Sequence, residues 1–418
     1  MAKRQVIFRE VPHMGVYHVM VEAANFGYRP GRPDWCDLGQ GQPEVGRIEG
    51  APSRLAWITL EPQDHAYGPI GGIEELREAV ADHYNRLFRM DADTRYRKEN
   101  VSISSGGRAM LSRILNTLAD VRIGHRVPDS PSYEGLLSHH QHRMKVVPVP
   151  TGPSESFALS PSRFSEAVKA NKLQAFLLSN PCNPTGQVIQ GADLKSYVTT
   201  ARRTKCTLIL DEFYSHFVYG EDGTPGEGPE SAACYVDQVE KDPVLIVDGM
   251  SKSFRYPGWR LGWTLGPSSI IEKLNRAAAA IDGGPSLPAQ RLAIKALEPE
   301  RADQETNAVR RVVTRKRNLM LDSLRSVGIR CEPESNGTFY VWGDLGGLDK
   351  PFNDAEAFFQ AALERKVMTV PGRFFDVNPG GANPPMKELK KWVRFSFGTP
   401  EEKMIVGLER LGEMIRGD

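Results

Sequence analysis

The segment Gly249-Met-Ser-Lys252-Ser-Phe-Arg-Tyr-Pro-Gly-Trp-Arg260 follows the apolar run Val244-Leu-Ile-Val, with only Asp248 between them. A short, continuous apolar run predicts a strand that is buried on both faces of a parallel sheet. Lys252 then stands just beyond the carboxyl end of that strand, among small residues. An amine held in such a partly buried position can lose its proton and act as a nucleophile or form a Schiff base. A solvated surface lysine is the alternative, and it is the commoner fate of a lysine.

Three more apolar runs have the same form and also end in polar or glycine-rich turns. They are Val101-Ser-Ile, Ala175-Phe-Leu-Leu and Thr207-Leu-Ile-Leu. Helical spacing of apolar residues lies between or before them, over residues 73–87 and 111–118. Alternation of strand and helix predicts an α/β domain with right-handed crossovers.

Polar residues follow two of these runs at the predicted sheet edge. Asp211 ends the run at 207–210, where parallel sheets bind ligands, although a helix cap or a solvated acid is an equal alternative. Asn183 lies in Ser179-Asn-Pro-Cys-Asn-Pro-Thr-Gly186, whose Asn-Pro steps predict a rigid loop. An ordinary turn is the alternative there, but the length and rigidity of this loop are unusual for a connector.

A possible anion site begins with Gly106, Gly107 and Arg108, because bare amides at a helix start bind phosphate. Arg260 and Arg394 could each grip a phosphate or carboxylate with two parallel hydrogen bonds. For each of these features taken alone, a plain turn or a surface salt bridge is the simpler interpretation.

Composition excludes several classes of protein. The 418 residues carry a net charge of +1, without a dense basic block, which argues against nucleic acid as a partner. The five scattered cysteines predict a reduced, cytoplasmic protein rather than a disulfide framework or a zinc site, and no metal site is expected. The start Met1-Ala-Lys-Arg-Gln leads into no apolar segment, and no run is long enough to span a membrane.

The pattern of predicted helices and strands changes near residue 298. A long charged helix is predicted over 302–326, strands over 337–342 and 393–397, and a last helix over 401–415. We therefore predict a large domain over residues 46–297 and a small α+β domain over 298–418. The first 45 residues show little regular pattern and are expected to pack with the small domain.

Taken in chain order, the glycine anion loop, Asn180-Pro-x-Asn-Pro-Thr-Gly, Asp211-Glu-x-Tyr214, Ser251-Lys252 and Arg260 form a specific set. The chain from about residue 37 to its end resembles the fold-type I pyridoxal-phosphate (PLP) enzymes, and within them the class I/II aminotransferases. The resemblance implies a mainly parallel seven-stranded sheet in a large α/β/α domain beside a small α+β domain. It implies PLP as the cofactor and a homodimer with shared active sites.

The resemblance also implies roles for individual residues. Lys252 would form the aldimine with the cofactor aldehyde and then move the proton between the substrate Cα and the cofactor. Asp211 would pair with the pyridine nitrogen, Asn183 and Tyr214 would bind the 3′ oxygen, and Tyr133 would stack on the ring. The phosphate cup would comprise Gly106, Gly107, Arg108, Ser251 and Arg260, together with Tyr67 from the neighbouring subunit.

The resemblance further implies that Arg394 binds the α-carboxylate of the substrate, in a pocket that Gly41 and Asn183 also line. Some relatives that act on dicarboxylic substrates carry a basic residue at the position of Arg108, so Arg108 could face a distal carboxylate. Two positions depart from the usual pattern. Gly124-His125 replaces a common Gly-Asp and is expected to affect only a turn, and Gly249 replaces a serine, so that one phosphate hydrogen bond would be lost or moved.

The implied reaction moves the amino group of an L-amino acid to a 2-oxo acid through pyridoxamine phosphate. A lyase, decarboxylase or oxidase on the same scaffold is the alternative, because fold alone does not decide the chemistry. A non-catalytic regulator is disfavoured because Lys252 is intact and because the motifs leave no room for a DNA-binding domain.

Overall fold

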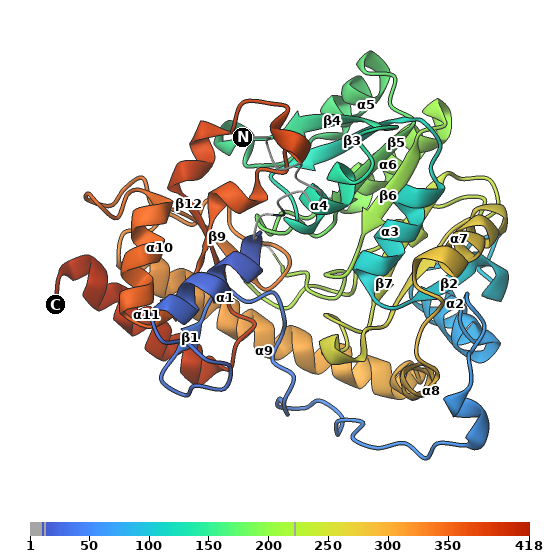
Figure 1. Ribbon diagram of the computed structural model, residues 1–418, viewed down its shortest axis with the longest axis horizontal. Helices are drawn as coiled ribbons and strands as arrows, with labels where there is room; N and C mark the ends of the chain where they lie inside the picture. The colour runs from blue at the N-terminus through green and yellow to red at the C-terminus, as the bar shows by residue number, and fades with distance from the viewer. Residues whose placement is uncertain (1–10, 12–13, 221–222) are drawn as a thin grey trace, which may run out of the picture.

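The computed structural model describes residues 11, 14–220 and 223–418, so the expectation about residues 1–5 lies outside the described part. Its main sheet has seven strands in the order β2-β8-β7-β6-β5-β3-β4. They are β2 (Val101–Ser104), β3 (Arg122–Val127), β4 (Lys145–Pro150), β5 (Ala175–Ser179), β6 (Thr207–Asp211), β7 (Val244–Gly249) and β8 (Gly262–Leu265). Only the pairs that β8 makes are antiparallel. The predicted sheet and its four predicted strands are therefore confirmed (Figure 1).

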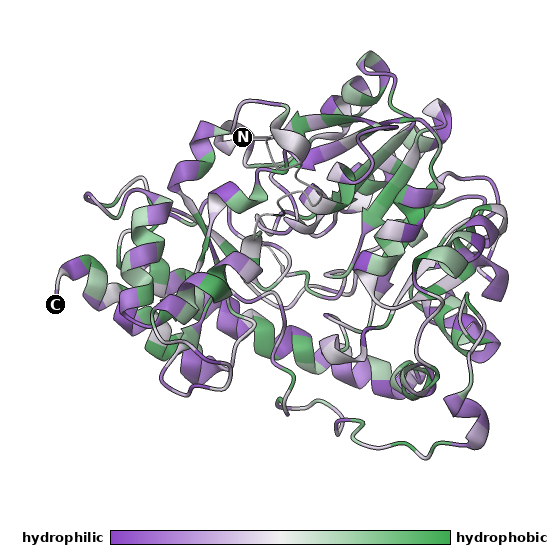
Figure 2. Cartoon of the chain, in the orientation of Figure 1, coloured by the Kyte–Doolittle hydropathy of each residue, from purple (hydrophilic) through white to green (hydrophobic). Residues whose placement is uncertain are grey.

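Helices cover both faces of this sheet. Successive residues of a strand point to opposite faces, so Ala175 and Leu177 of β5 join one core while Phe176 and Leu178 join another. The first core also holds apolar residues of α3 (Gly107–Thr117), α4 (Ser132–Ser138) and α7 (Ser268–Ile281). The second holds those of α2 (Glu74–Phe88), α5 (Pro161–Ala170), α6 (Gly191–Thr204) and α8 (Leu287–Ala296). Figure 2 shows the apolar strands between these helices.

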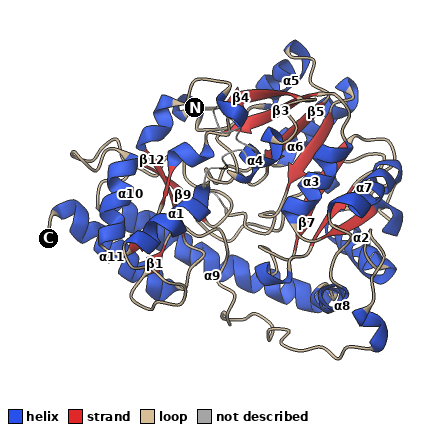
Figure 3. Cartoon of the chain, in the orientation of Figure 1, coloured by secondary structure: helices blue, strands red, loops and turns tan. Residues whose placement is uncertain are grey.

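A second, three-stranded antiparallel sheet lies toward the C-terminus, as Figure 3 shows by the separate group of strands. Its order is β11 (Val370–Pro371), β12 (Trp392–Ser396) and β9 (Tyr340–Asp344). The helices α9 (Pro299–Ser326), α10 (Ala355–Glu364) and α11 (Glu401–Arg416) accompany it. The elements predicted at 302–326, 337–342, 393–397 and 401–415 are all present, with ends that differ by a few residues.

The N-terminal segment contains a helix that the sequence did not predict, α1 (Gly15–Asn25). Val19 and Ala23 of α1 pack in an aromatic core with Trp342 and Trp392. Strand β1 (Cys36–Asp37) pairs in parallel with β10 (Val367–Met368). The segment thus contacts the C-terminal region, while the domain limits at 45 and 297 stay a prediction.

The expectation for Gly124-His125 was wrong, because both residues lie inside β3 rather than in a turn. A Cβ on Gly124 would stand 2.5 Å from Leu173 Cδ1 and 2.6 Å from the buried Phe176 ring, so a side chain at this position would have to displace both. His125 is buried, which lowers its pKa to about 4 and keeps the ring neutral. Within the described part of the chain, every helix is too short or too polar to cross a bilayer.

Candidate active site

A cavity of about 670 Å³ opens at the carboxyl ends of β5, β6 and β7, where the second sheet faces the first. Most of the residues predicted from sequence line it: Gly41, Gly107, Arg108, Asn183, Asp211, Tyr214, Ser251, Lys252, Arg260 and Arg394. They come from segments spread over the whole chain, which the topology brings to one sheet edge.

Lys252 lies in the loop after β7, and its amine donates a hydrogen bond to the Gly41 carbonyl. Burial, followed by the positive charges of Arg394 and Arg108, lowers the pKa of Lys252 to about 7. A lysine of this kind exists in part as the free amine near neutral pH, which is the form that attacks a carbonyl carbon.

Asp211 is the last residue of β6. Its Oδ2 accepts a hydrogen bond of 2.9 Å from the hydroxyl of Tyr133, which is itself fully buried. Burial raises the pKa of Asp211 to about 6, while the Tyr133 hydrogen bond opposes that rise. A carboxylate in this setting is stabilised by a cationic N–H, such as a protonated pyridine nitrogen, placed within reach.

Arg394 extends from β12 into the cavity. Its Nη1 donates to Asn183 Oδ1 at 2.9 Å, its Nη2 donates to the Gly39 carbonyl at 2.6 Å, and its Cζ lies 4.0 Å from the centre of the Tyr340 ring. Arg394 Nε is buried and has no hydrogen-bond partner among the described residues. A buried guanidinium held this firmly, with N–H donors still unused, is suited to binding a carboxylate.

Tyr214 and Tyr340 bring their hydroxyls together. The two oxygens are 2.8 Å apart, and both rings are buried. Tyr340 therefore connects Tyr214, on the β6 side of the cavity, with Arg394, on the β12 side. Sequence reasoning did not single out Tyr340, because nothing in Gly337-Thr-Phe-Tyr-Val-Trp shows which of its aromatic side chains meets the arginine.

The start of α3 forms the anion-binding side. Gly106 has φ +95°, and a Cβ there would stand 2.5 Å from Arg260 Nη2. A Cβ on Gly107 would stand 2.4 Å from the Phe213 ring. The two glycines thus let the backbone amides, the Arg260 guanidinium and the ring lie against one another. Amides, Arg260, Arg108 and the Ser251 hydroxyl are a donor set suited to a phosphate dianion.

The structure explains the glycine at position 249. A Cβ there would stand 2.5 Å from the Leu261 carbonyl oxygen and 2.6 Å from Gly262 Cα. These are backbone atoms of the neighbouring segment that pairs β8 with β7, and they cannot move aside cheaply. The close backbone approach accounts for the glycine at this position, and the expected loss or shift of one phosphate hydrogen bond stays a prediction.

Three predicted residues do not line the cavity. Gly106 and Tyr133 lie just behind it and act on Arg260 and Asp211, as described above. Tyr67 is fully exposed and lies outside the cavity of its own chain. Conversely, sequence reasoning missed several lining residues, namely Ser130, Ser179, Phe213, Phe375 and the segment Met14–Tyr17.

Comparison with known proteins assigns the chain to a class. The family model for aminotransferase class I and II matches residues 33–411, so the chain belongs to that family, and the relatives described below are named aminotransferases. This bears out the resemblance inferred from the motifs and makes the protein a transaminase-type enzyme.

Individual relatives differ in their named substrates. The chain is 29% identical to an aspartate aminotransferase of Pyrococcus abyssi, with 94% of each chain covered. It is also 29% identical to a valine–pyruvate aminotransferase of Mycobacterium tuberculosis, with 99% of each covered. Among solved structures, an aminotransferase from Mycobacterium tuberculosis matches with a TM-score of 0.79 and 25% identity over all of both chains. A Thermus thermophilus aspartate aminotransferase double mutant matches with a TM-score of 0.78, 26% identity and coverage of 98% and 97%.

Proposed function

We propose that this protein is a PLP-dependent aminotransferase that moves the amino group of an L-amino acid to a 2-oxo acid. The observation that carries the proposal is the placement of Lys252, with its lowered pKa, in one cavity with Asp211 and the Arg394 guanidinium. These groups supply an amine, a carboxylate and a carboxylate-binding site, which are the elements that transamination requires.

The residues present fit PLP by the chemistry of their donors. Gly107 and Arg108 amides, Ser251 and Arg260 would hold its phosphate, and the cradle at Gly106 and Gly107 has no space for a Cβ. Asp211 would hold a proton on the ring nitrogen, and Asn183 and Tyr214 would bind the 3′ oxygen. When bound, PLP supplies a carbonyl that accepts the amine and a ring that accepts the electrons of the broken Cα–H bond.

Individual side chains of the protein would then bind the substrate, move its proton and hold the cofactor-binding residues in place. Arg394 binds and orients the α-carboxylate of the amino acid. Lys252, whose pKa of about 7 allows it to take up and release a proton near neutrality, moves the proton at the substrate Cα. Tyr133, which lies behind the cavity, would hold Asp211 in place through its hydroxyl, and the stacking on the ring that the resemblance implies stays a prediction.

For the substrate we propose a dicarboxylic amino acid, bound at its distal end by Arg108. Arg108 lines the cavity and is close enough to Lys252 and Arg260 to lower the pKa of both. Relatives named for aspartate support this choice, whereas the relative named for valine and pyruvate argues for an apolar side pocket. Preference for aspartate or glutamate should be lost in Arg108→Leu, and an unchanged preference would refute the assignment.

We also propose a cytoplasmic homodimer in which Tyr67 reaches the phosphate site of the neighbouring subunit. The full exposure of Tyr67 and of Trp57, at 104% and 77%, supports a covering partner for this extended segment. The five free cysteines support a reducing compartment. Sedimentation should give twice the mass of one chain, and Tyr67→Phe should weaken PLP binding without altering that mass.

The decisive experiment for the reaction is single-turnover spectroscopy of the PLP-loaded protein with dicarboxylic, aromatic, basic and aliphatic L-amino acids. Transamination converts the bound cofactor to its pyridoxamine form and yields the matching 2-oxo acid in equal amount. Release of ammonia, carbon dioxide or hydrogen peroxide instead would identify a lyase, a decarboxylase or an oxidase and would overturn the proposal.

A further inference from the structure

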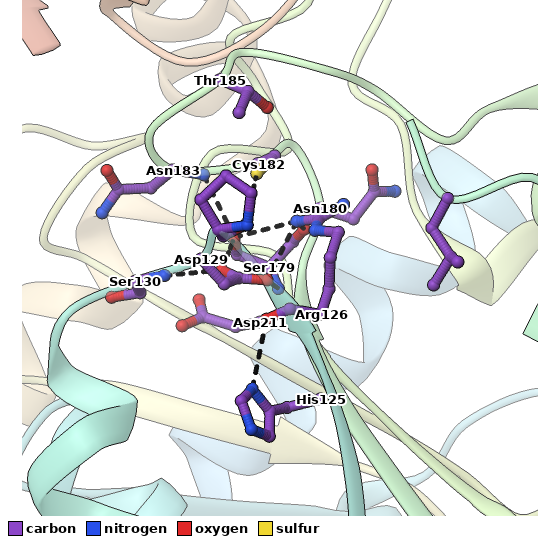
Figure 4. Close-up of polar contacts among 12 residues, drawn as sticks. His125, Arg126, Asp129, Ser130, Ser179, Asn180, Cys182, Asn183, Thr185 and Asp211 are labelled. Atoms are coloured by element: carbon purple, nitrogen blue, oxygen red, sulfur yellow. Dashed lines mark hydrogen bonds and ion pairs between the residues drawn. The ribbon is translucent and has the colours of Figure 1, made fainter. Parts of the chain in front are cut away.

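The end of β3 carries a buried carboxylate that no motif indicated. Asp129 is 0% exposed and accepts hydrogen bonds at both oxygens. Its Oδ1 accepts from the Ser130 amide at 2.7 Å and from the Ser179 hydroxyl at 2.5 Å, and its Oδ2 accepts from the Ser179 amide at 3.2 Å. Figure 4 shows Asp129 and Ser179 side by side, next to Asn183 and Asp211. The tips of β3 and β5 are thus held together behind the cavity.

Arg126 provides the opposite charge. Its Nη2 donates to Asp129 Oδ2 at 3.0 Å and to the Ser179 carbonyl at 2.6 Å, and the side chain is 1% exposed. Burial raises the pKa of Asp129, and the adjacent Arg126 opposes that rise. With the guanidinium and three further donors around it, the ionised carboxylate is the form that this geometry accommodates.

The ionised carboxylate fixes the direction of the next hydrogen bond. An ionised carboxylate only accepts hydrogen bonds, so the Ser179 hydroxyl must donate its single proton to the Asp129 carboxylate. The free lone pairs of that oxygen then face the backbone amide of Asn183, which donates to it at 3.1 Å. Asn183 in turn accepts from Arg394 Nη1 at 2.9 Å. Ser179 therefore holds the backbone of Asn183, and the side-chain Oδ1 of the same residue accepts from Arg394, so that Asp129 and Arg394 are linked through two hydrogen-bonded residues.

A second contact joins the same residue to the other side of the cavity. The Asp129 amide donates to the Phe375 carbonyl at 3.1 Å, and the Phe375 ring lies 5.2 Å from Arg394 Cζ. Ser130, Ser179 and Phe375 all line the cavity. Asp129 is thus linked, through its side chain to Ser179 and through its backbone to Phe375, with two of the groups that contact or position the Arg394 guanidinium.

We propose that Asp129, acting through the Ser179 hydroxyl, is a positioning residue that sets Asn183 and thereby Arg394 for the carboxylate of the amino acid. The inference rests on the proposed function, because it names residues that serve the same site. Neither Asp129 nor Ser179 touches the reacting atoms; both determine where Asn183 and Arg394 lie.

The test uses Ser179→Ala, which removes the relay and leaves the Arg126–Asp129 ion pair intact. The matched control is Ser102→Ala, a fully buried serine on β2 whose hydroxyl donates to Asn275 at 2.7 Å, outside the cavity. We expect KM for the amino acid to rise about tenfold in Ser179→Ala, the effect of one hydrogen bond at a charged site, with kcat within about threefold. Ser102→Ala should retain wild-type KM.

A second readout does not depend on turnover. Because Asn183 would bind the 3′ oxygen of the cofactor, the pH midpoint of the bound cofactor's absorbance change should rise in Ser179→Ala and stay unchanged in Ser102→Ala. Asp129→Asn alone leaves Arg126 buried without its counter-ion, which destabilises the fold, so the double variant Arg126→Met/Asp129→Asn, which removes both charges, is compared with Ser179→Ala. The double variant should show the same rise in KM for the amino acid, and the same rise in the pH midpoint of the absorbance change, as Ser179→Ala.

Different outcomes would overturn the positioning role and the proposed function. Wild-type KM and absorbance in Ser179→Ala, or a fall in kcat and thermal stability at unchanged KM, would overturn the positioning role. If the wild-type protein itself converts no amino acid, the proposed function fails first. In that case an unaltered absorbance midpoint in Ser179→Ala would overturn the relay independently.

Discussion

Tyr340 offers a test of how the substrate carboxylate is held, because it contacts two site residues through different parts of its side chain. The ring lies 4.0 Å from Arg394 Cζ, and the hydroxyl is 2.8 Å from the hydroxyl of Tyr214. Tyr340→Phe removes only the second contact, whereas Tyr340→Leu removes both. The two variants therefore separate support of the arginine from support of the tyrosine.

The expected magnitudes follow from these contacts. A desolvated cation–π contact is worth about 2 kcal/mol, so Tyr340→Leu should raise KM for the amino acid about 30-fold. Tyr340→Phe leaves the buried Tyr214 hydroxyl without this partner, which costs about 1 to 3 kcal/mol. Since Tyr214 would bind the cofactor, that cost should appear as weaker PLP binding, about tenfold, with KM for the amino acid little changed.

Steady-state kinetics and a PLP titration followed by absorbance measure the two effects separately. Phe339→Leu serves as the control, because the Phe339 ring also packs beside Tyr214, with centroids 5.4 Å apart, but has no hydroxyl. The reasoning is refuted if Tyr340→Phe and Tyr340→Leu raise KM equally, since the ring would then contribute nothing to Arg394.

Three further predictions concern electrostatics and packing. Burial lowers the pKa of both His83 and His216 to about 3, so the unfolded chain binds more protons than the folded chain below pH 6.5. At pH 5 this difference in proton binding lowers the free energy of unfolding by about 2 kcal/mol per histidine. The free energy of unfolding should thus fall from pH 7 to pH 5, less steeply in His83→Gln, and an equal slope in that variant would contradict the reasoning. Gly249→Ser should lower the free energy of unfolding, measured by urea titration, by about 2 kcal/mol, because the Cβ of the new serine meets backbone atoms. An unfolding free energy equal to that of the wild type would contradict the packing argument. The rate at which the PLP-free protein combines with PLP should rise with a midpoint near pH 7, and a midpoint near 10 would show that Lys252 has an ordinary pKa.

Much of this fold could be predicted because its signals are local. Continuous apolar runs mark β5, β6 and β7, and the residue after each run lies at the carboxyl edge by geometry alone. Asp211 and Lys252 were therefore placed at the cavity from their positions behind two strands. Arg394 and the glycines of α3 joined them through the resemblance of the whole set.

Other features depend on distant partners and left no local signal. Strand β3 carries His125 and Arg126, which are buried only because Asp129 and the neighbouring strands surround them. The polar residues interrupt the apolar run that would otherwise mark a strand. Likewise Val19 and Ala23 of α1 belong to the core that holds Trp342 and Trp392, so the helix depends on packing against segments more than three hundred residues away.

The central claim is that Lys252 is the residue that binds the cofactor covalently. Reduction of the PLP-loaded protein with borohydride, followed by proteolysis and mass spectrometry, fixes the cofactor on the amine that carries it. We predict a single reduced adduct on Lys252, lost in Lys252→Ala although that variant still folds. An adduct on another lysine, or no adduct in a protein that turns over amino acids, would contradict the account.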